Sequence, residues 1–475
     1  MLGMEEECVD HVSPRRKTWR QRVNESVLNS EPASADALQS GSTANAHDRS
    51  LYLRVTLRIV PLLFVCYVVA FLDRINVGFA KLQMQDALGF SDSVYGLGAG
   101  IFFLSYCLLE VPSAMLLRRM GAKRTIARIM ICWGIVGACS AFVTNVTQFY
   151  IVRLLLGVFE AGFFPGVIFY LSSWFPERRR GVIIACFMVG FPVAGLVGGP
   201  VSGWAMTSLA HVANLAGWQW LYIVEALPAV VLGLVTLFLL DDNIDKAKWL
   251  TEAEKSVLRQ AFQVEMERKR KAGNNGHAKL AEALSDPKVY MLAFIDFAFV
   301  CGTYSVTFWL PTVMKDSGIS NLSLLGWLSV IPYGMGAIGM VAISRSSDRM
   351  LERRWHAAIA GFVGAVALLL VSHPTNSPAL TVGLLTIACV GIFATNVLIW
   401  SLAADYLNGS PAAATSIAFV NCIGLLSGFC SPFVIGWLKT ATGTLVSGLY
   451  VMTAILVSGI LVMLLGFRRH TQARL

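Results

Sequence analysis

The sequence contains about a dozen apolar runs of roughly 20 residues, and no other feature constrains the fold as strongly. A run of that length crosses roughly 30 Å of hydrocarbon as an α-helix. Hydrophobic residues make up 56% of the 475 residues and charged residues only 14%, which excludes an ordinary water-soluble enzyme. We therefore predict an all-α polytopic membrane protein with spans at 57–79, 94–117, 125–144, 148–171, 181–206, 218–240, 288–311, 322–343, 356–372, 379–403, 412–437 and 444–467.

Polar segments divide the chain into five predicted parts. Residues 1–50 contain few large apolar side chains, so we expect a disordered tail. Residues 51–240 and 288–467 hold six spans each and are predicted to form two six-helix bundles. Residues 241–287 join the bundles, and residues 468–475 form a second short tail.

The joining segment has its own helix signals. Thr251 and Glu254 have the spacing of a capping box, and a charged helical stretch follows them. The stretch is expected to end at Gly273-Asn274-Asn275-Gly276. We predict an amphipathic helix outside the membrane.

Positive charge is distributed in a pattern that indicates topology. Lys and Arg cluster in the short loops at 118–124, 178–180 and 345–354, whereas loops of the other parity hold isolated lysines such as Lys81, Lys315 and Lys439. The positive-inside rule then places both termini and the joining segment in the cytoplasm, in a multi-pass protein of the inner (plasma) membrane. It also accounts for the net charge of +9, so no nucleic-acid partner is needed.

Cysteine and histidine give no sign of a metal or redox centre. The ten cysteines are scattered without paired spacing, and the seven histidines do not cluster. No metal and no other cofactor is expected.

Small residues recur at matching places in the two halves. The fifth span contains Gly195, Gly199, Pro200 and Gly203, and the eleventh has a similar series at 424–437. Such residues let helices approach closely, and Gly with Pro can bend a helix. Ordinary packing glycines are an equally good explanation for any one position.

Several stretches together carry a family resemblance. They are FLDRINVGFA at 71–80, EVPSAMLLRRMGAKR at 110–124, RLLLGVFEAGFFPG at 153–166 with SSWFPERRRG at 172–181, GWQWLYIVEALPA at 217–229, AKWLTEAEK at 247–255 and FWLPT at 308–312. The chain resembles the anion:cation symporters of the major facilitator superfamily, which include tartrate, phthalate, glucarate and galactonate permeases. The resemblance implies a monomer in which two six-helix bundles surround a cavity that opens alternately to each side.

The superfamily's loop motif, roughly G-x3-D-R-x-G-R/K-R/K, is altered in the first half. Arg118 stands at its acidic position, and Ala114 stands where many members have Gly. The second copy keeps Asp348 and Arg349. The resemblance implies that Asp348 and Arg349 help to hold the cytoplasmic gate shut.

Charges inside the spans are the main functional signal, because a charge at the bilayer centre survives mainly beside a partner or a water-filled path. Glu160 lies near the middle of the fourth span, and Arg153 precedes it by seven residues on the same helical face, about 10 Å away along the axis. Burial disfavours a charged carboxylate, so we predict that Glu160 exchanges protons and that Arg153 is a supporting charge. Matching glutamates in galactonate-type symporters take part in proton coupling. The alternative is a structural carboxylate paired with Arg153 or with another helix.

Asp73 and Arg74 lie side by side near the end of the first span. The planar fork of donors on Arg74 suits a carboxylate, which makes it the best candidate for binding an organic anion. The resemblance assigns a second protonation site to Asp73 and a substrate contact to Arg74. In the alternative interpretation, Arg74 snorkels to the membrane interface.

Three further polar residues lie in the spans of the second half. The resemblance places Tyr304 and Asn421 at the cavity, where both could bind substrate, although either could equally join two helices. Asp296 has no counterpart in the family pattern and is either a private feature of the substrate site or an interfacial residue.

The sequence thus predicts proton-coupled uptake of a small organic anion, such as a dicarboxylate, a sugar acid or an aromatic carboxylate. The alternative is a drug or metabolite efflux antiporter, because the glycine and proline pattern from Gly195 to Gly203 resembles an exporter motif. A membrane-embedded enzyme would need paired Asp motifs, HxxxH or a Ser-His arrangement at one membrane face, and none is visible. The expected partners are the anion, the proton and the lipid bilayer.

Overall fold

The computed structural model describes residues 35–271, 284–373, 377–407, 410 and 412–467. The contacts between residues divide the chain into two units, residues 1–54 and a compact unit of residues 55–475. The sites described below belong to the second unit. Within the described ranges helices are the only regular secondary structure. Twelve helical spans in these ranges are long and apolar enough to cross a membrane. The prediction of an all-α polytopic membrane protein is confirmed.

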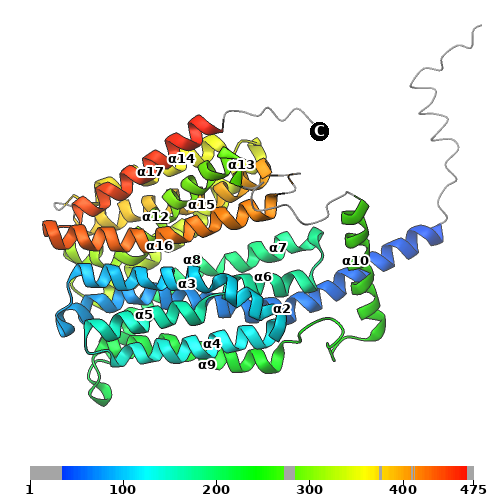
Figure 1. Cartoon of the computed structure of the whole chain (residues 1–475), viewed down its shortest axis with the longest axis horizontal. Helices are drawn as coiled ribbons and strands as arrows, with labels where there is room; N and C mark the ends of the chain where they lie inside the picture. Colours follow the sequence, from blue (N-terminus) through cyan, green and yellow to red (C-terminus); the bar gives the residue numbers. More distant parts are fainter. Residues whose placement is uncertain (1–34, 272–283, 374–376, 408–409, 411, 468–475) are drawn as a thin grey trace, which may run out of the picture. The chain divides into compact units, whose positions relative to one another are not determined.

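The first six spans form one bundle, drawn from blue to green in Figure 1. The fourth and fifth spans consist of two α-helices each. The elements are α2 (Ala35–Leu88), α3 (Asp92–Met120), α4 (Ala122–Cys139) with η1 (Ser140–Phe142), α5 (Val146–Glu160), α6 (Phe163–Trp174), α7 (Glu177–Met188), α8 (Gly190–Ser208), η2 (Val212–Asn214) and α9 (Gly217–Leu239).

The last six spans form the second bundle, drawn from green to red in Figure 1. Asp286 caps the first of these helices by accepting a hydrogen bond from the backbone N–H of Lys288 at 2.9 Å. The elements are α12 (Pro287–Asp316), α13 (Leu322–Met350), α14 (Arg354–Val371), α15 (Pro378–Leu407), α16 (Ala413–Thr442) and α17 (Val446–Gly466).

The first span is longer than predicted. Helix α2 continues past position 79 to Leu88, because buried apolar residues such as Leu82 and Met84 keep the helical pattern going. Lys81, which was assigned to a loop, therefore lies inside the helix and is buried. At its other end α2 begins at Ala35, within the segment predicted to be a disordered tail, whereas residues 1–34 and 468–475 of the predicted tails lie outside the described residues.

Two spans that were predicted as single helices are interrupted. The fourth breaks at Gly162, whose φ of 88° is a left-handed conformation that glycine adopts without strain. The fifth is divided at Val189, between α7 and α8, although the backbone there keeps a right-handed helical conformation (φ −61°, ψ −18°). The bend suggested by Pro200 does not occur as a break, since α8 runs through that residue.

Glycines bring the two bundles together along two seams, α8 against α13 and α3 against α16. A Cβ on Gly199 would meet the Ser329 side chain and the backbone of α13. A Cβ on Gly436 would meet the carbonyl of Asp92 and the backbone at Gly96. The repeated small residues of the fifth and eleventh spans thus occupy equivalent places, one on each seam, where the helices meet backbone to backbone.

The joining segment contains α10 (Glu252–Lys271), and its predicted capping box is present. The Thr251 backbone N–H donates to Glu254 Oε2 at 2.9 Å, and the Glu254 N–H donates to Thr251 Oγ1 at 3.3 Å. The Trp249 ring, just before the helix, stacks on Trp174 with ring centroids 5.9 Å apart. The segment is therefore held against the first bundle, while its predicted end at 273–276 lies outside the described residues.

Candidate substrate cavity

A cavity of about 220 Å³ lies between the two bundles, and both contribute to its wall. Since a water molecule takes about 30 Å³, the space accommodates several waters or one small organic molecule. Most of the wall is apolar and aromatic. Its charged and strongly polar members include Arg74, Glu110, Glu160, Asp296, Tyr304 and Asn421.

Arg74 and Glu160 form an ion pair in the cavity wall. The Arg74 Nε donates to Glu160 Oε1 at 3.0 Å, and Nη2 donates to the same oxygen. Both residues are buried, Glu160 completely. The other carboxylate oxygen, Oε2, has no hydrogen-bond partner within the part of the chain that the structure describes. Such an oxygen is costly to bury unless something else, such as a proton, water or ligand, satisfies it.

The break in the fourth span positions Glu160. Helix α5 ends at Glu160, and Gly162 turns the chain before α6 begins. A Cβ on Gly162 would collide with the Ser113 side chain, so this turn has both a conformational and a steric need for glycine. Interrupted helices at mid-membrane are typical of transporter binding sites, because irregular backbone is tolerated where it lines a cavity.

Aromatic rings surround the Arg74 guanidinium. Its central carbon lies 4.8 Å from the Phe71 ring centroid, 5.4 Å from Phe102 and 5.3 Å from Tyr106. Arg74 is 8% exposed, so the alternative in which it snorkels to the interface is wrong. The rings supply cation–π contacts that help to keep the guanidinium in an apolar wall.

The structure places two other predicted residues away from the cavity wall. Asp73 accepts hydrogen bonds from Trp133 Nε1 at 2.9 Å and from Asn76 Nδ2 at 3.1 Å, so its carboxylate is directed toward α4. Arg153 donates from Nε to the Gly98 carbonyl at 3.3 Å, and the partner of Glu160 is Arg74 instead. Neither arrangement tests the proton-coupling role predicted for Asp73 or the supporting role predicted for Arg153.

The cavity brings together Arg74 and Glu160 from the first bundle with Tyr304 and Asn421 from the second, as sequence reasoning predicted. It also contains Glu110, which is not among the candidate residues of the sequence analysis. Glu110 lies on α3, and the sequence of that span alone does not indicate which face of the helix borders the cavity. Asp296, which had two competing interpretations, lines the cavity and is only 2% exposed, so it is not interfacial.

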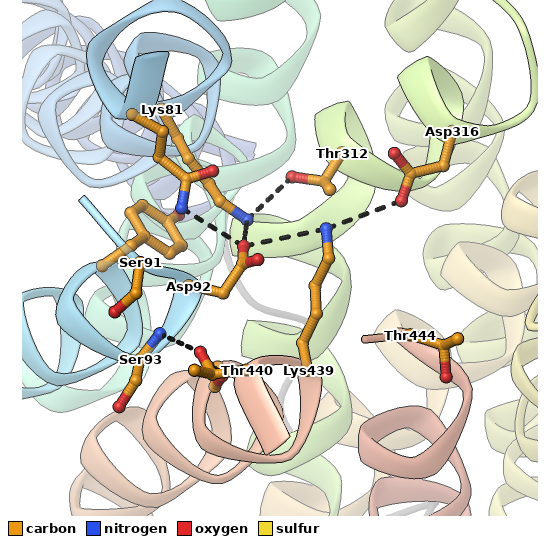
Figure 2. Close-up of polar contacts among 12 residues, drawn as sticks. Lys81, Ser91, Asp92, Ser93, Thr312, Asp316, Lys439, Thr440 and Thr444 are labelled. Carbon is orange, nitrogen blue, oxygen red and sulfur yellow. Dashed lines mark hydrogen bonds and ion pairs between the residues drawn. The ribbon is translucent and has the colours of Figure 1, made fainter. Parts of the chain in front are cut away.

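Polar contacts close one end of the bundle interface, and Figure 2 shows them. Lys81 Nζ lies 2.7 Å from Asp92 Oδ1 and donates to Thr312 Oγ1 at 3.3 Å. Lys439 Nζ lies 3.7 Å from the same Asp92 oxygen and 3.6 Å from Asp316 Oδ2. We call Lys81, Asp92, Asp316 and Lys439 the charge cluster; it connects α2 and α3 of the first bundle to α12 and α16 of the second.

The predicted gating residues Asp348 and Arg349 lie at the last turn of α13. Asp348 Oδ1 is 3.5 Å from Arg353 Nη1, and Arg353 Nε is 2.6 Å from Asp405 Oδ2. These contacts connect α13, α14 and α15 within the second bundle. The gating role of Asp348 and Arg349 stays a prediction.

Comparisons with known proteins agree with this architecture. The family model described as Major Facilitator Superfamily matches residues 63–432. A protein named as a tartrate transporter in Agrobacterium vitis is 44% identical and aligns over 86% of this chain and 93% of its own length. A quinolone resistance transporter of Acinetobacter baumannii is 38% identical over 87% of this chain and 94% of its own.

The fold also matches solved structures. The xylose transporter XylE from E. coli, in a partially occluded inward open conformation, aligns with a TM-score of 0.68 at 14% identity, covering 88% of this chain and 99% of that one. Because the family match covers well over half of the sequence and both relatives align over nearly their whole length, this protein is a membrane transporter, not an enzyme, and it belongs to the Major Facilitator Superfamily.

Proposed function

We propose that this transporter takes up a small organic anion together with protons by alternating access. The observation that carries the proposal is the Arg74–Glu160 pair in a cavity between two bundles. A guanidinium fork binds carboxylates well, and a buried carboxyl with one unsatisfied oxygen is suited to holding a proton. The relative named as a tartrate transporter supports an organic acid as substrate.

The pair offers a simple route for coupling. While Glu160 is charged, it occupies the Arg74 Nε and Nη2 donors that a substrate carboxylate would need. When Glu160 takes up a proton it becomes a weaker acceptor, and the guanidinium can turn to the substrate. Release of the proton restores the competition and expels the anion. Proton and anion would then bind together and leave together.

The distribution of charge supports an orientation. Helix α3 runs from Asp92 in the charge cluster to Met120 within the basic segment 118–124, so the cluster and this segment lie at opposite ends of that helix. If basic loops face the cytoplasm, the charge cluster lies at the outer side. We therefore propose that both termini and the joining segment are cytoplasmic, and that the outer gate is the closed one here.

A second candidate function is efflux by proton antiport. The cavity wall carries three carboxyl groups, on Glu110, Glu160 and Asp296, and one guanidinium, on Arg74. Such a balance also suits a substrate with positive charge. The quinolone resistance relative supports this alternative.

Uptake into proteoliposomes distinguishes the two functions. We expect tartrate or another labelled organic acid to accumulate under an inward proton gradient, and an uncoupler to abolish the accumulation. If no acid accumulates, or if accumulation ignores both the gradient and the uncoupler, symport is wrong. Expulsion of a cationic drug against its gradient in the same vesicles would favour antiport.

The Lys439→Gln variant is expected to open the outer gate more often. It removes one contact between the bundles but leaves Lys81 paired with Asp92. Loss of a partly exposed ion pair costs on the order of 1 kcal/mol, so the open population should rise roughly fivefold. Spin labels at the exposed positions Ala87 and Thr444, in a background without the native cysteines, would report it as a longer distance.

Lys288→Gln is the matched control, because it makes the same chemical change far from the charge cluster. Lys288 lies at the start of α12, whereas Asp316 of the cluster lies at the end of that helix. The control's distance distribution should equal that of the labelled parent. Equal distributions in the Lys439→Gln variant and the parent would contradict a gating role for the charge cluster.

A further inference from the structure

Asp296 is a buried acid in the cavity wall. It lies on α12, is 2% exposed and lines the cavity. Among the described residues its Oδ1 has no hydrogen-bond partner, although Glu160 across the same cavity is paired with Arg74. Leaving a carboxyl oxygen buried and unsatisfied is costly, and inside a membrane span such a residue is a functional candidate by default.

The fold makes room for this carboxyl group. A Cβ at Gly424 of α16 would overlap Oδ2 of Asp296. Gly424 also lines the cavity, and so does Asn421, one helical turn before it. The glycine thus lets α16 pass close to Asp296, with the unsatisfied oxygen and the Asn421 side chain in one part of the wall.

The cavity therefore has two polar poles. The first bundle supplies a donor, the Arg74 guanidinium, and the second supplies an acceptor, the Asp296 carboxyl group. Tyr304 lines the same cavity as these two groups. A simple carboxylate would satisfy the first pole and leave the second unpaired, which a buried site penalises strongly.

We propose that Asp296 is a specificity-determining residue that accepts a hydrogen bond from a donor group on the substrate. The preferred substrates are then organic acids that carry a hydroxyl or an ammonium group in addition to the carboxylate bound by Arg74. This inference rests on the proposed function and narrows its substrate class.

Matched substrates test the inference. Tartrate and aspartate differ from succinate by added hydroxyl or ammonium groups. We expect the purified wild-type protein to prefer at least one of them over succinate, both in substrate-induced thermal stabilisation and in proteoliposome uptake. In Asp296→Leu that preference should fall by about tenfold or more, the loss of one hydrogen bond to a charged group.

Two further variants keep the test decisive if Asp296→Leu fails to fold. Gly424→Ala displaces the carboxyl group without removing it and should reduce the same preference. Asp296→Asn retains an acceptor, so a hydroxyl preference should partly survive whereas an ammonium preference should be lost.

Asp286→Asn is the matched control, because it makes the same chemical change at the N-cap of the same helix. Its substrate preference should equal that of wild type. If the folded variants at Asp296 and Gly424 also keep the wild-type preference, or if wild type prefers succinate, the inference is overturned while the proposed function stands. If wild type moves no organic acid, both fall.

Discussion

Glu160→Gln is expected to lose gradient-driven accumulation while it continues to exchange substrate across the membrane. Glutamine keeps the shape of the side chain and an oxygen that accepts from Arg74, but it cannot exchange a proton. One pH unit is worth about 1.4 kcal/mol for each proton, or about tenfold accumulation, and the variant should fall from that level to equilibration.

The measurement compares accumulation with counterflow in one batch of proteoliposomes. Glu225→Gln is the control, because Glu225 is also a buried carboxyl group but accepts a hydrogen bond from Ser202 at 2.8 Å in a different part of the first bundle. Wild-type accumulation by Glu160→Gln would remove Glu160 from the coupling mechanism. Loss of both accumulation and counterflow would indicate a binding or structural role.

Arg74→Ala is expected to weaken substrate binding and also to destabilise the protein. Truncation of a buried, hydrogen-bonded charge costs about 2–5 kcal/mol in binding, so affinity should fall at least about thirtyfold. It also leaves the Glu160 carboxylate without its cation in a buried position, which costs a further 3–5 kcal/mol or so of folding stability.

The double variant Arg74→Ala/Glu160→Gln separates these two effects. Removing the charge from Glu160 should recover most of the lost melting temperature but none of the lost affinity, because the donor fork is still missing. Isothermal titration with the wild-type substrate and thermal melting of the same samples give both quantities. Normal affinity in Arg74→Ala would show that another group binds the anion.

The spans were predictable because the bilayer imposes a length and a polarity that local sequence must satisfy. The matching glycines were also readable, since close packing leaves a mark at fixed spacing. The break at Gly162 left a weaker signal, a glycine followed closely by Pro165, which suits the first turn of a new helix.

The partners of the charged residues could not be predicted, because they come from distant parts of the chain. Arg153 was the visible neighbour of Glu160, yet the actual partner is Arg74, 86 positions away in the sequence. The isolated lysines were interpreted as loop charges, although Lys81 is buried beside the Trp309 ring at 3.7 Å. Which helices face each other decides these contacts, and periodicity within one helix does not contain that information.

The charge cluster divides evenly between the bundles. Lys81 and Asp92 belong to the first bundle, and Lys439 and Asp316 belong to the second. When the bundles separate at this end, each keeps one cation beside one anion, so no unbalanced charge is exposed to an apolar surrounding. The electrostatic work of opening is then limited to exchanging one ion pair, Lys439–Asp92, and one hydrogen bond, Lys81–Thr312, for contacts with water. A modest binding energy therefore suffices to switch the transporter between its two states.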